Sequence, residues 1–195
     1  MDIQLFAAKL ERPLTDAETE TFLRIMPPER RERLLSMKNE LPQEPLCAYA
    51  ILFMVTHTIY GWKKFPPIRY NKYGKPEFDG YPDVQFNLSH TRSAVLVGVH
   101  DEPLGVDIEK LRPVSERSME RIAGTTSRQE FFESWVRRES RSKWNGAGLG
   151  SIRERENPAM RGERIEFIDT FPDYVACICT HSDARIAPIR TFTIK

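Results

Sequence analysis

Residues 86–109 constrain the fold of this chain more than any other stretch. Within it, residues 94–99 (AVLVGV) form a short, apolar run rich in β-branched side chains, and Pro103 and Gly105 mark a turn directly afterwards. The pattern predicts a hairpin of two strands.

Residues 106–109 alternate apolar and acidic side chains. Because successive side chains of a strand point to opposite faces, we expect Val106 and Ile108 on one face and Asp107 and Glu109 on the other. Two neighbouring carboxylates repel each other unless a hard divalent cation lies between them, and such oxygen ligands suit Mg²⁺. The alternative interpretation is an acidic strand edge that faces solvent, which is common.

A third carboxylate follows on a predicted helix. Residues 135–143 (WVRRESRSK) contain no glycine or proline, and Trp135, Glu139 and Lys143 are spaced four apart, so they share one helix face. Glu139 would then be a third metal ligand, and Lys143 would meet a phosphate carried by that metal. The alternative is an ordinary Glu–Lys pair on a solvated face, worth about 0.2–0.5 kcal/mol.

Taken together, these motifs resemble the surfactin-type 4′-phosphopantetheinyl transferases. The resemblance covers nearly the whole chain and rests on FNLSH (86–90), GVDIEK (105–110), WVRRESRSK (135–143), GAGL (146–149), ERPL (11–14), PERRER (28–33), YGKP (73–76) and YVAC (174–177). It implies an α+β fold of two similar α/β subdomains in a pseudo-twofold arrangement. The subdomains would be residues 1–104 and 105–195, with the active site at their interface.

The resemblance also implies a reaction. The 4′-phosphopantetheine group of coenzyme A would pass to a serine of an apo acyl or peptidyl carrier protein, releasing 3′,5′-ADP. Mg²⁺, or Mn²⁺ in its place, would lie on Asp107, Glu109 and Glu139. Glu139 is also the candidate base for the serine proton, and Lys143 would neutralise the phosphates.

The resemblance assigns further residues to coenzyme A. Arg30 and Arg33 match the cations that hold its 3′-phosphate, Lys75 of the GKP turn matches a phosphate contact, and Ser89 and His90 match contacts to its nucleotide part. Taken alone, such cations are usually solvated. A Ser–His pair can also suggest a hydrolase, but adjacent strand residues face opposite ways and cannot form a nucleophile–base pair.

The chain departs from the family in two places. Family members usually carry an arginine where this chain has Pro45, and Lys38 is the candidate replacement. After Glu109 the chain reaches Trp135 early, without the full segment that helps to cover the active site and receive the carrier protein. These departures keep open a coenzyme A- or nucleotide-binding homologue with weak or lost transferase activity. An unrelated Mg²⁺-dependent hydrolase is the third interpretation.

Composition narrows the class of protein. The 29 Lys and Arg against 28 Asp and Glu leave a net charge of +1, which argues against a nucleic-acid binder. We expect no signal segment and no membrane span. Cys47, Cys177 and Cys179 lie in apolar surroundings typical of buried thiols in a reducing compartment, so we expect a cytoplasmic location. The family resemblance implies a monomer.

Local patterns predict the remaining elements. Thr15 and Glu18 form a capping-box pattern at the start of a helix, and residues 46–59 are an apolar helix that forms the core of the first half. The other predicted elements are a strand at 3–8, helices from 28 and near 115–122, an exposed loop at 152–162, and strands at 163–168, 174–180 and 188–194 that close the second half.

Overall fold

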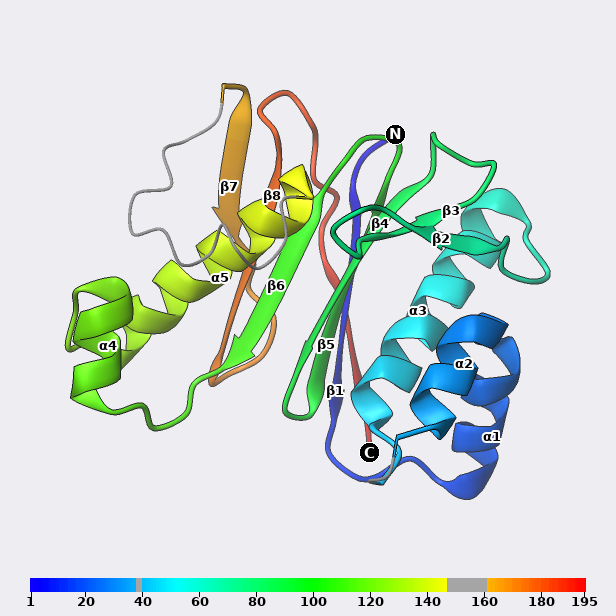
Figure 1. The fold of residues 1–195 in the computed structure, drawn as a ribbon, viewed down its shortest axis with the longest axis horizontal. Helices are drawn as coiled ribbons and strands as arrows, with labels where there is room; N and C mark the ends of the chain where they lie inside the picture. Colours follow the sequence, from blue (N-terminus) through cyan, green and yellow to red (C-terminus); the bar gives the residue numbers. More distant parts are fainter. Residues whose placement is uncertain (38–39, 147–160) are drawn as a thin grey trace.

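The computed structural model describes residues 1–37, 40–146 and 161–195 (Figure 1). Lys38, residues 147–149 of the GAGL segment and most of the predicted exposed loop therefore lie outside the described residues.

Across the described residues the fold is α+β, as predicted. The helices are α1 (Asp16–Ile25), α2 (Pro28–Leu35), α3 (Gln43–Tyr60), α4 (Glu116–Ala123) and α5 (Arg128–Asn145). The strands are β1 (Gln4–Leu10), β2 (Ile68–Tyr70), β3 (Pro76–Phe78), β4 (Gln85–Thr91), β5 (Ala94–His100), β6 (Gly105–Lys110), β7 (Glu163–Phe167), β8 (Tyr174–His181) and β9 (Arg190–Ile194).

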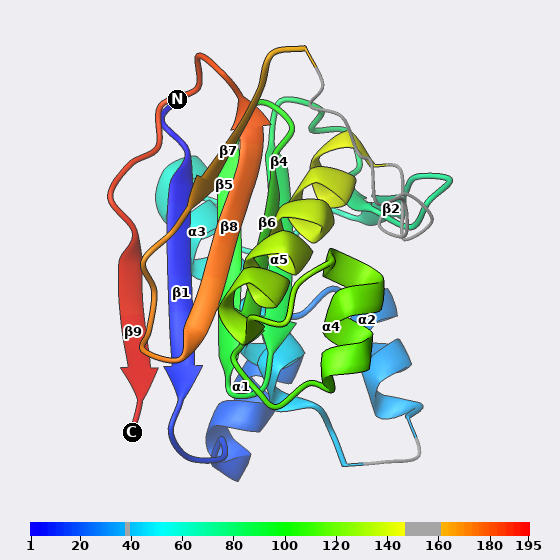
Figure 2. The ribbon, with the colours of Figure 1, turned by 90° about the vertical axis from the view of Figure 1, so that its left-hand side faces the viewer.

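The described strands form two main sheets that pack face to face. One has the order β4-β5-β1-β9 and the other β6-β8-β7, while β2 and β3 form a separate pair. Figure 1 shows α1, α2 and α3 beside the four-stranded sheet, and α4 and α5 on the opposite side of the molecule, beside the three-stranded sheet. Figure 2, turned by 90°, shows α5 lying across β6 and β8.

The apolar layer between the two sheets fixes which way β6 faces. Leu5 and Leu96 of the larger sheet pack there against Val106, Ile108 and Ile178 of the smaller one, and all five are at most 1% exposed. Because Val106 and Ile108 point into this layer, the neighbouring acids of β6 point to its other face, toward α5. The predicted alternation of residues 106–109 is confirmed.

The predicted hairpin turn at Pro103 and Gly105 is wrong, because β5 does not pair with the strand that follows it. The hairpin of this stretch is formed by β4 and β5, which pair antiparallel. Its turn contains Ser93, whose backbone is left-handed (φ 58°). The following strand does not extend the hairpin. β6 crosses to the second sheet and pairs antiparallel with β8, with Asp107 opposite Cys177.

The helices begin and end where the local chemistry predicts. The Thr15 hydroxyl accepts a hydrogen bond from the Glu18 amide (3.2 Å), and the Glu18 carboxylate accepts one from the Thr15 amide (2.8 Å), which confirms the capping box. The apolar helix predicted at 46–59 lies within α3 and packs on β4 and β5. Ser127 caps the start of α5, and Gly146, directly after the last residue of the helix, has the left-handed conformation that glycine adopts readily.

The predicted location of the last strand is wrong. Residues 188–194 do not close the second half, because β9 pairs in parallel with β1 of the first sheet. After β8 the chain returns through a bridge between Ile186 and Ile3, and β9 covers the edge of β1 that β5 leaves open. An unpaired strand edge is a liability, and the end of the chain removes this one.

The three cysteines are free and buried, as predicted. Burial raises the pKa of the Cys47 thiol to about 12 and that of Cys177 to about 11, so both thiols are neutral at physiological pH. In the part of the chain that the structure describes, no helix has the length and apolar character needed to cross a membrane.

Candidate active site

Asp107 and Lys143 form the centre of the site. Asp107 is only 4% exposed, on the face of β6 that α5 covers. Its Oδ1 accepts hydrogen bonds from Lys143 Nζ (2.6 Å) and Ser89 Oγ (2.7 Å). Lys143 Nζ also donates to Ser89 Oγ (3.0 Å) and to the Val106 carbonyl (3.1 Å). The lysine therefore ties α5 to both β4 and β6.

The second oxygen of Asp107 has a different environment. Oδ2 is buried and has no hydrogen-bond partner among the described residues. A buried carboxylate oxygen without a partner is costly, so such atoms are uncommon unless a ligand or water completes them. An oxygen in this environment is available to bind a ligand or a water.

Glu109 and Glu139 lie around this centre. Glu109 is partly buried, and its Oε2 accepts hydrogen bonds from Thr91 Oγ1 (3.1 Å) and Arg112 Nη1 (2.9 Å). Burial raises the pKa of Glu139, and repulsion from Asp107 and Glu109 adds to the rise, while Lys143 opposes it. The three predicted metal ligands thus influence one another electrostatically.

The residue types fit a magnesium site. Within residues 1–37, 40–146 and 161–195, no group of three histidine, cysteine or carboxylate side chains is arranged to hold a metal ion. The donor set is nevertheless the hard-oxygen kind that Mg²⁺ prefers, and the unpartnered Oδ2 of Asp107 is a free ligand atom within it.

A cavity of about 240 Å³ opens beside this centre. Lys75, Asn87, Glu139 and Lys143 are among its lining residues, so the GKP turn and α5 face the same space. Lys75 Nζ lies 3.4 Å from the Leu104 carbonyl, and burial lowers its pKa. Three residues that the sequence assigns to phosphates and catalysis therefore share one cavity, although they come from segments far apart in the chain.

The remaining predicted residues lie on α2 and β4. Arg30 lies over the Tyr49 ring (6.0 Å to the centroid), and its buried Nε has no hydrogen-bond partner among the described residues. Arg33 is exposed on the same helix. Ser89 is buried and bonded to Asp107, whereas His90 is exposed on the opposite face of β4. This arrangement agrees with the rejection of a Ser–His nucleophile pair.

Charged residues of both signs affect His90. Desolvation lowers its pKa, and the nearby charges of Lys143 and Arg30 act in the same direction, while Glu44 and Asp107 oppose them. The imidazole therefore lies within electrostatic range of both Arg30 and Lys143.

Sequence comparison gives the same family as the motifs. The chain is 28% identical over 162 residues to the 4′-phosphopantetheinyl transferase Sfp of Bacillus subtilis (strain 168), which covers 75% of this chain and 72% of that protein. It is 27% identical over 206 aligned positions to the 4′-phosphopantetheinyl transferase ffp of Bacillus subtilis (91% and 92%). These matches support membership of the surfactin-type 4′-phosphopantetheinyl transferase family.

A shorter match points the same way. The 4′-phosphopantetheinyl transferase psf-1 of Bacillus pumilus is 34% identical over 88 residues, 39% of this chain and 38% of that protein. No protein-family model matches the chain. The family resemblance predicted from the motifs is confirmed by these relatives.

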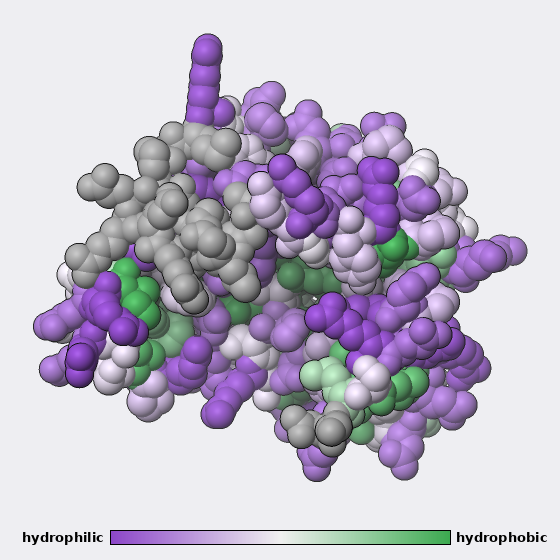
Figure 3. Space-filling view, viewed as in Figure 1, coloured by the Kyte–Doolittle hydropathy of each residue, from purple (hydrophilic) through white to green (hydrophobic). Residues whose placement is uncertain are grey.

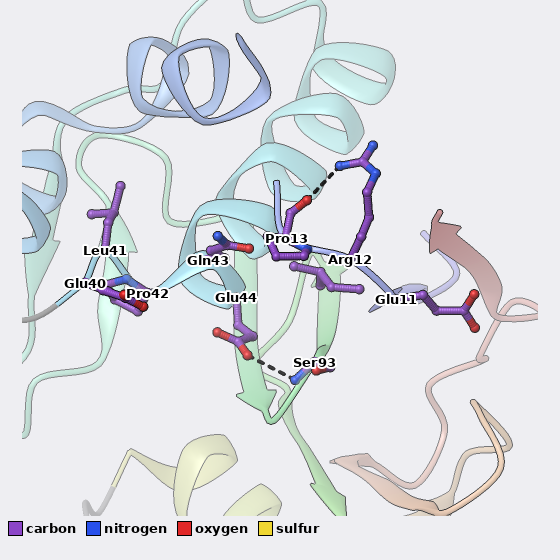
Figure 4. Close-up of a pocket in the computed structure, with 10 residues that line it drawn as sticks. Glu11, Arg12, Pro13, Glu40, Leu41, Pro42, Gln43, Glu44 and Ser93 are labelled. Atoms are coloured by element: carbon purple, nitrogen blue, oxygen red, sulfur yellow. Dashed lines mark hydrogen bonds between the residues drawn. The ribbon is translucent and has the colours of Figure 1, made fainter. Parts of the chain in front are cut away.

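Not every cavity of this transferase-like chain belongs to the site. A larger one, about 450 Å³, lies at the start of α3 and contains none of the predicted residues. Figure 4 shows Glu44 there, whose carboxylate accepts the Ser93 amide (3.0 Å) and so ties α3 to the hairpin turn. In Figure 3, apolar surface is visible in a recess between the two sides of the molecule, surrounded by hydrophilic residues.

Sequence reasoning missed the polar contacts that support the carboxylates. Thr91 and Arg112 hold Glu109, and Asn87 accepts the Val106 amide (2.9 Å). A signal was present, because polar side chains recur at every second position of β4 (Asn87, Ser89 and Thr91) and therefore share one face.

Proposed function

We propose that this chain transfers the 4′-phosphopantetheine group of coenzyme A to a serine of an apo acyl or peptidyl carrier protein. The observation that carries the proposal is the convergence of Asp107, Lys143, Glu139 and Lys75, from three separate segments, beside one cavity. The names of the similar proteins agree with this activity.

The fold would consist of two α/β subdomains, residues 1–104 and 105–195, in a pseudo-twofold arrangement with the site between them. Each half has a long helix packed on its sheet, α3 on β5 and α5 on β6, which supports the division. The strand β9 would be the exception, since it returns to the first sheet.

Asp107, Glu109 and Glu139 would hold Mg²⁺, or Mn²⁺ in its place. When bound, the ion would stabilise the charge of the pyrophosphate. The support for this assignment is the carboxylate donor set and the unpartnered Oδ2 of Asp107. Lys143 also contributes to the charge of this site, because its contact with Asp107 Oδ1 balances part of the negative charge of the three carboxylates.

The cations would bind coenzyme A along its length. Lys75 and Lys143 would neutralise its pyrophosphate, Arg30 and Arg33 would hold the 3′-phosphate, and Ser89 and His90 would contact the nucleotide part. Lys75 is half-buried, and Arg30 Nε is buried without a hydrogen-bond partner among the described residues. Both observations favour a role in binding anions over that of a solvated side chain.

In the reaction, the carrier serine oxygen forms a bond to the β-phosphorus as the pyrophosphate P–O bond breaks, and 3′,5′-ADP leaves. Glu139 would accept the serine proton. Its partial burial and its place in the lining of the cavity favour this role. The protein otherwise positions the groups and balances their charge.

The proposal extends to the setting of the reaction. The carrier protein and coenzyme A would be the partners, with no nucleic acid and no membrane, and the protein would act as a cytoplasmic monomer.

Release of 3′,5′-ADP tests this function. We expect chromatography to detect the nucleotide when the protein is incubated with coenzyme A, Mg²⁺ and an apo carrier protein, and not when the carrier serine is replaced by alanine. Binding of coenzyme A without nucleotide release across several carriers would instead support the binding homologue with weak or lost activity. Release that does not need the carrier would support a hydrolase.

Replacing Lys75 tests the coenzyme A site. We expect Lys75→Ala to weaken coenzyme A binding by about tenfold or more, since a hydrogen bond to a charged group contributes about 1.5–3 kcal/mol. Isothermal titration calorimetry measures the change. Lys72→Ala is the matched control, because Lys72 lies in the same turn but is exposed and lies over the Tyr73 ring. Equal affinities of the two variants would contradict the role of Lys75.

A further inference from the structure

Three polar side chains of β4 bind the open edge of β6. The edge of β6 that does not pair with β8 presents backbone amides to β4, and each alternate amide finds a side-chain oxygen there. The contacts are Val106 N to Asn87 Oδ1 (2.9 Å), Ile108 N to Ser89 Oγ (3.3 Å) and Lys110 N to Thr91 Oγ1 (3.5 Å). Side chains therefore replace the backbone ladder that would join two neighbouring strands.

The two hydroxyls of this row also hold the two acids of β6. Ser89 Oγ donates to Asp107 Oδ1 (2.7 Å), and Thr91 Oγ1 donates to Glu109 Oε2 (3.1 Å). A hydroxyl has one hydrogen to donate and two lone pairs to accept with, so each can serve a carboxylate and a backbone amide together. The same two-sided contact thus occurs twice, two residues apart on both strands.

The contact at Glu109 leaves one carboxylate oxygen available. Both of its donors, Thr91 and Arg112, bind Oε2, and no described residue donates a hydrogen bond to Oε1. The contact at Asp107 has the same form, with its donors on Oδ1 and a buried, unpartnered Oδ2. In each case one oxygen is fixed by β4 and the other is left for a ligand.

We infer that Thr91 is a positioning residue, which fixes the carboxylate of Glu109 for cation binding through its two-sided contact with Glu109 and the Lys110 amide. The inference rests on the proposed function, because it gives Glu109 a divalent cation to bind. In this role Thr91 would itself touch neither the cation nor coenzyme A. Its effect is to hold the acid and the adjacent backbone of β6 in one arrangement.

Direct measurement of Mn²⁺ binding tests this role without relying on turnover. Electron paramagnetic resonance gives the Mn²⁺ affinity in the presence of coenzyme A. We expect Thr91→Val, which keeps the shape and removes the hydroxyl, to weaken Mn²⁺ binding by about tenfold or more, as changes to residues that orient metal ligands commonly do. Thr91→Ser keeps the hydroxyl and should bind Mn²⁺ like the wild type.

The outcomes separate this inference from the proposed function. Wild-type affinity in Thr91→Val, or equal weakening in Thr91→Ser, would overturn the role of the Thr91 hydroxyl while leaving the proposed reaction intact. A wild-type protein that binds no Mn²⁺ would overturn the metal part of the proposed function and the inference with it. Thr91→Ala removes the same hydroxyl without adding bulk, and it takes the place of Thr91→Val if that variant does not fold.

Discussion

Glu139→Gln is expected to lower the rate of phosphopantetheine transfer by about 10²–10⁴-fold, the usual contribution of general base catalysis. The amide keeps the size of the side chain but cannot accept the serine proton. Coenzyme A binding should be largely retained, because the cations that would bind its phosphates are unchanged. Steady-state kinetics gives the rate, and calorimetry gives the affinity for coenzyme A.

Glu133→Gln is the matched control for this variant. Glu133 is partly buried on the same helix and is hydrogen-bonded to Gln129 (2.9 Å), but it does not line the cavity of the site. We expect it to transfer at the wild-type rate. Unchanged turnover in Glu139→Gln would refute the role of Glu139 as base, and equal losses in both variants would indicate a general effect on α5.

Gly105→Ala is expected to separate β6 from α5. A Cβ atom at this position would lie 2.0 Å from the Ser140 carbonyl oxygen and 2.4 Å from the Trp144 amide nitrogen. Both are backbone atoms of α5, so the helix itself would have to move. Overpacking of this kind costs about 1–3 kcal/mol or more of unfolding free energy. Urea denaturation measures this loss.

The same variant should lose activity beyond its loss of stability. The contact of 2.6 Å between Lys143 and Asp107 joins α5 to β6, and a shift of the helix breaks it. We therefore expect a large fall in transfer rate even at temperatures where the variant remains folded.

Gly98→Ala provides the comparison for Gly105→Ala. Its new Cβ would come closest to the tip of the Leu104 side chain (2.5 Å), which can move, and it would lie in the apolar layer away from α5. We expect a smaller loss of stability and near-normal transfer. Wild-type activity in folded Gly105→Ala would show that the close approach of α5 to β6 is not needed for the site.

Local sequence patterns predicted much of this fold because their causes are local. The capping box at Thr15 involves residues three apart, and the alternation of residues 106–109 follows from strand geometry. The place of β9 could not be predicted in this way. Its partner β1 lies at the other end of the chain, and periodicity carries no information about which edge a strand joins.

The candidate site shows the same division. Spacing indicated that Asp107 and Glu109 share a face and that Glu139 and Lys143 share another, and the family resemblance assigned their roles. Spacing could not indicate that Lys143 reaches Asp107, because that contact depends on how α5 crosses β6. The support of Glu109 by Thr91 likewise depends on β6 leaving the hairpin and lying beside β4, which is a tertiary event.

Intact-mass spectrometry of an apo carrier protein tests the proposed reaction most directly. The carrier is incubated with this protein, coenzyme A and Mg²⁺, with EDTA and Asp107→Ala as controls. We predict that the carrier gains the mass of one phosphopantetheine group and that both controls abolish the gain. No gain across a panel of fatty-acid, polyketide and peptide carriers, with coenzyme A still bound by calorimetry, would contradict the proposed transferase function.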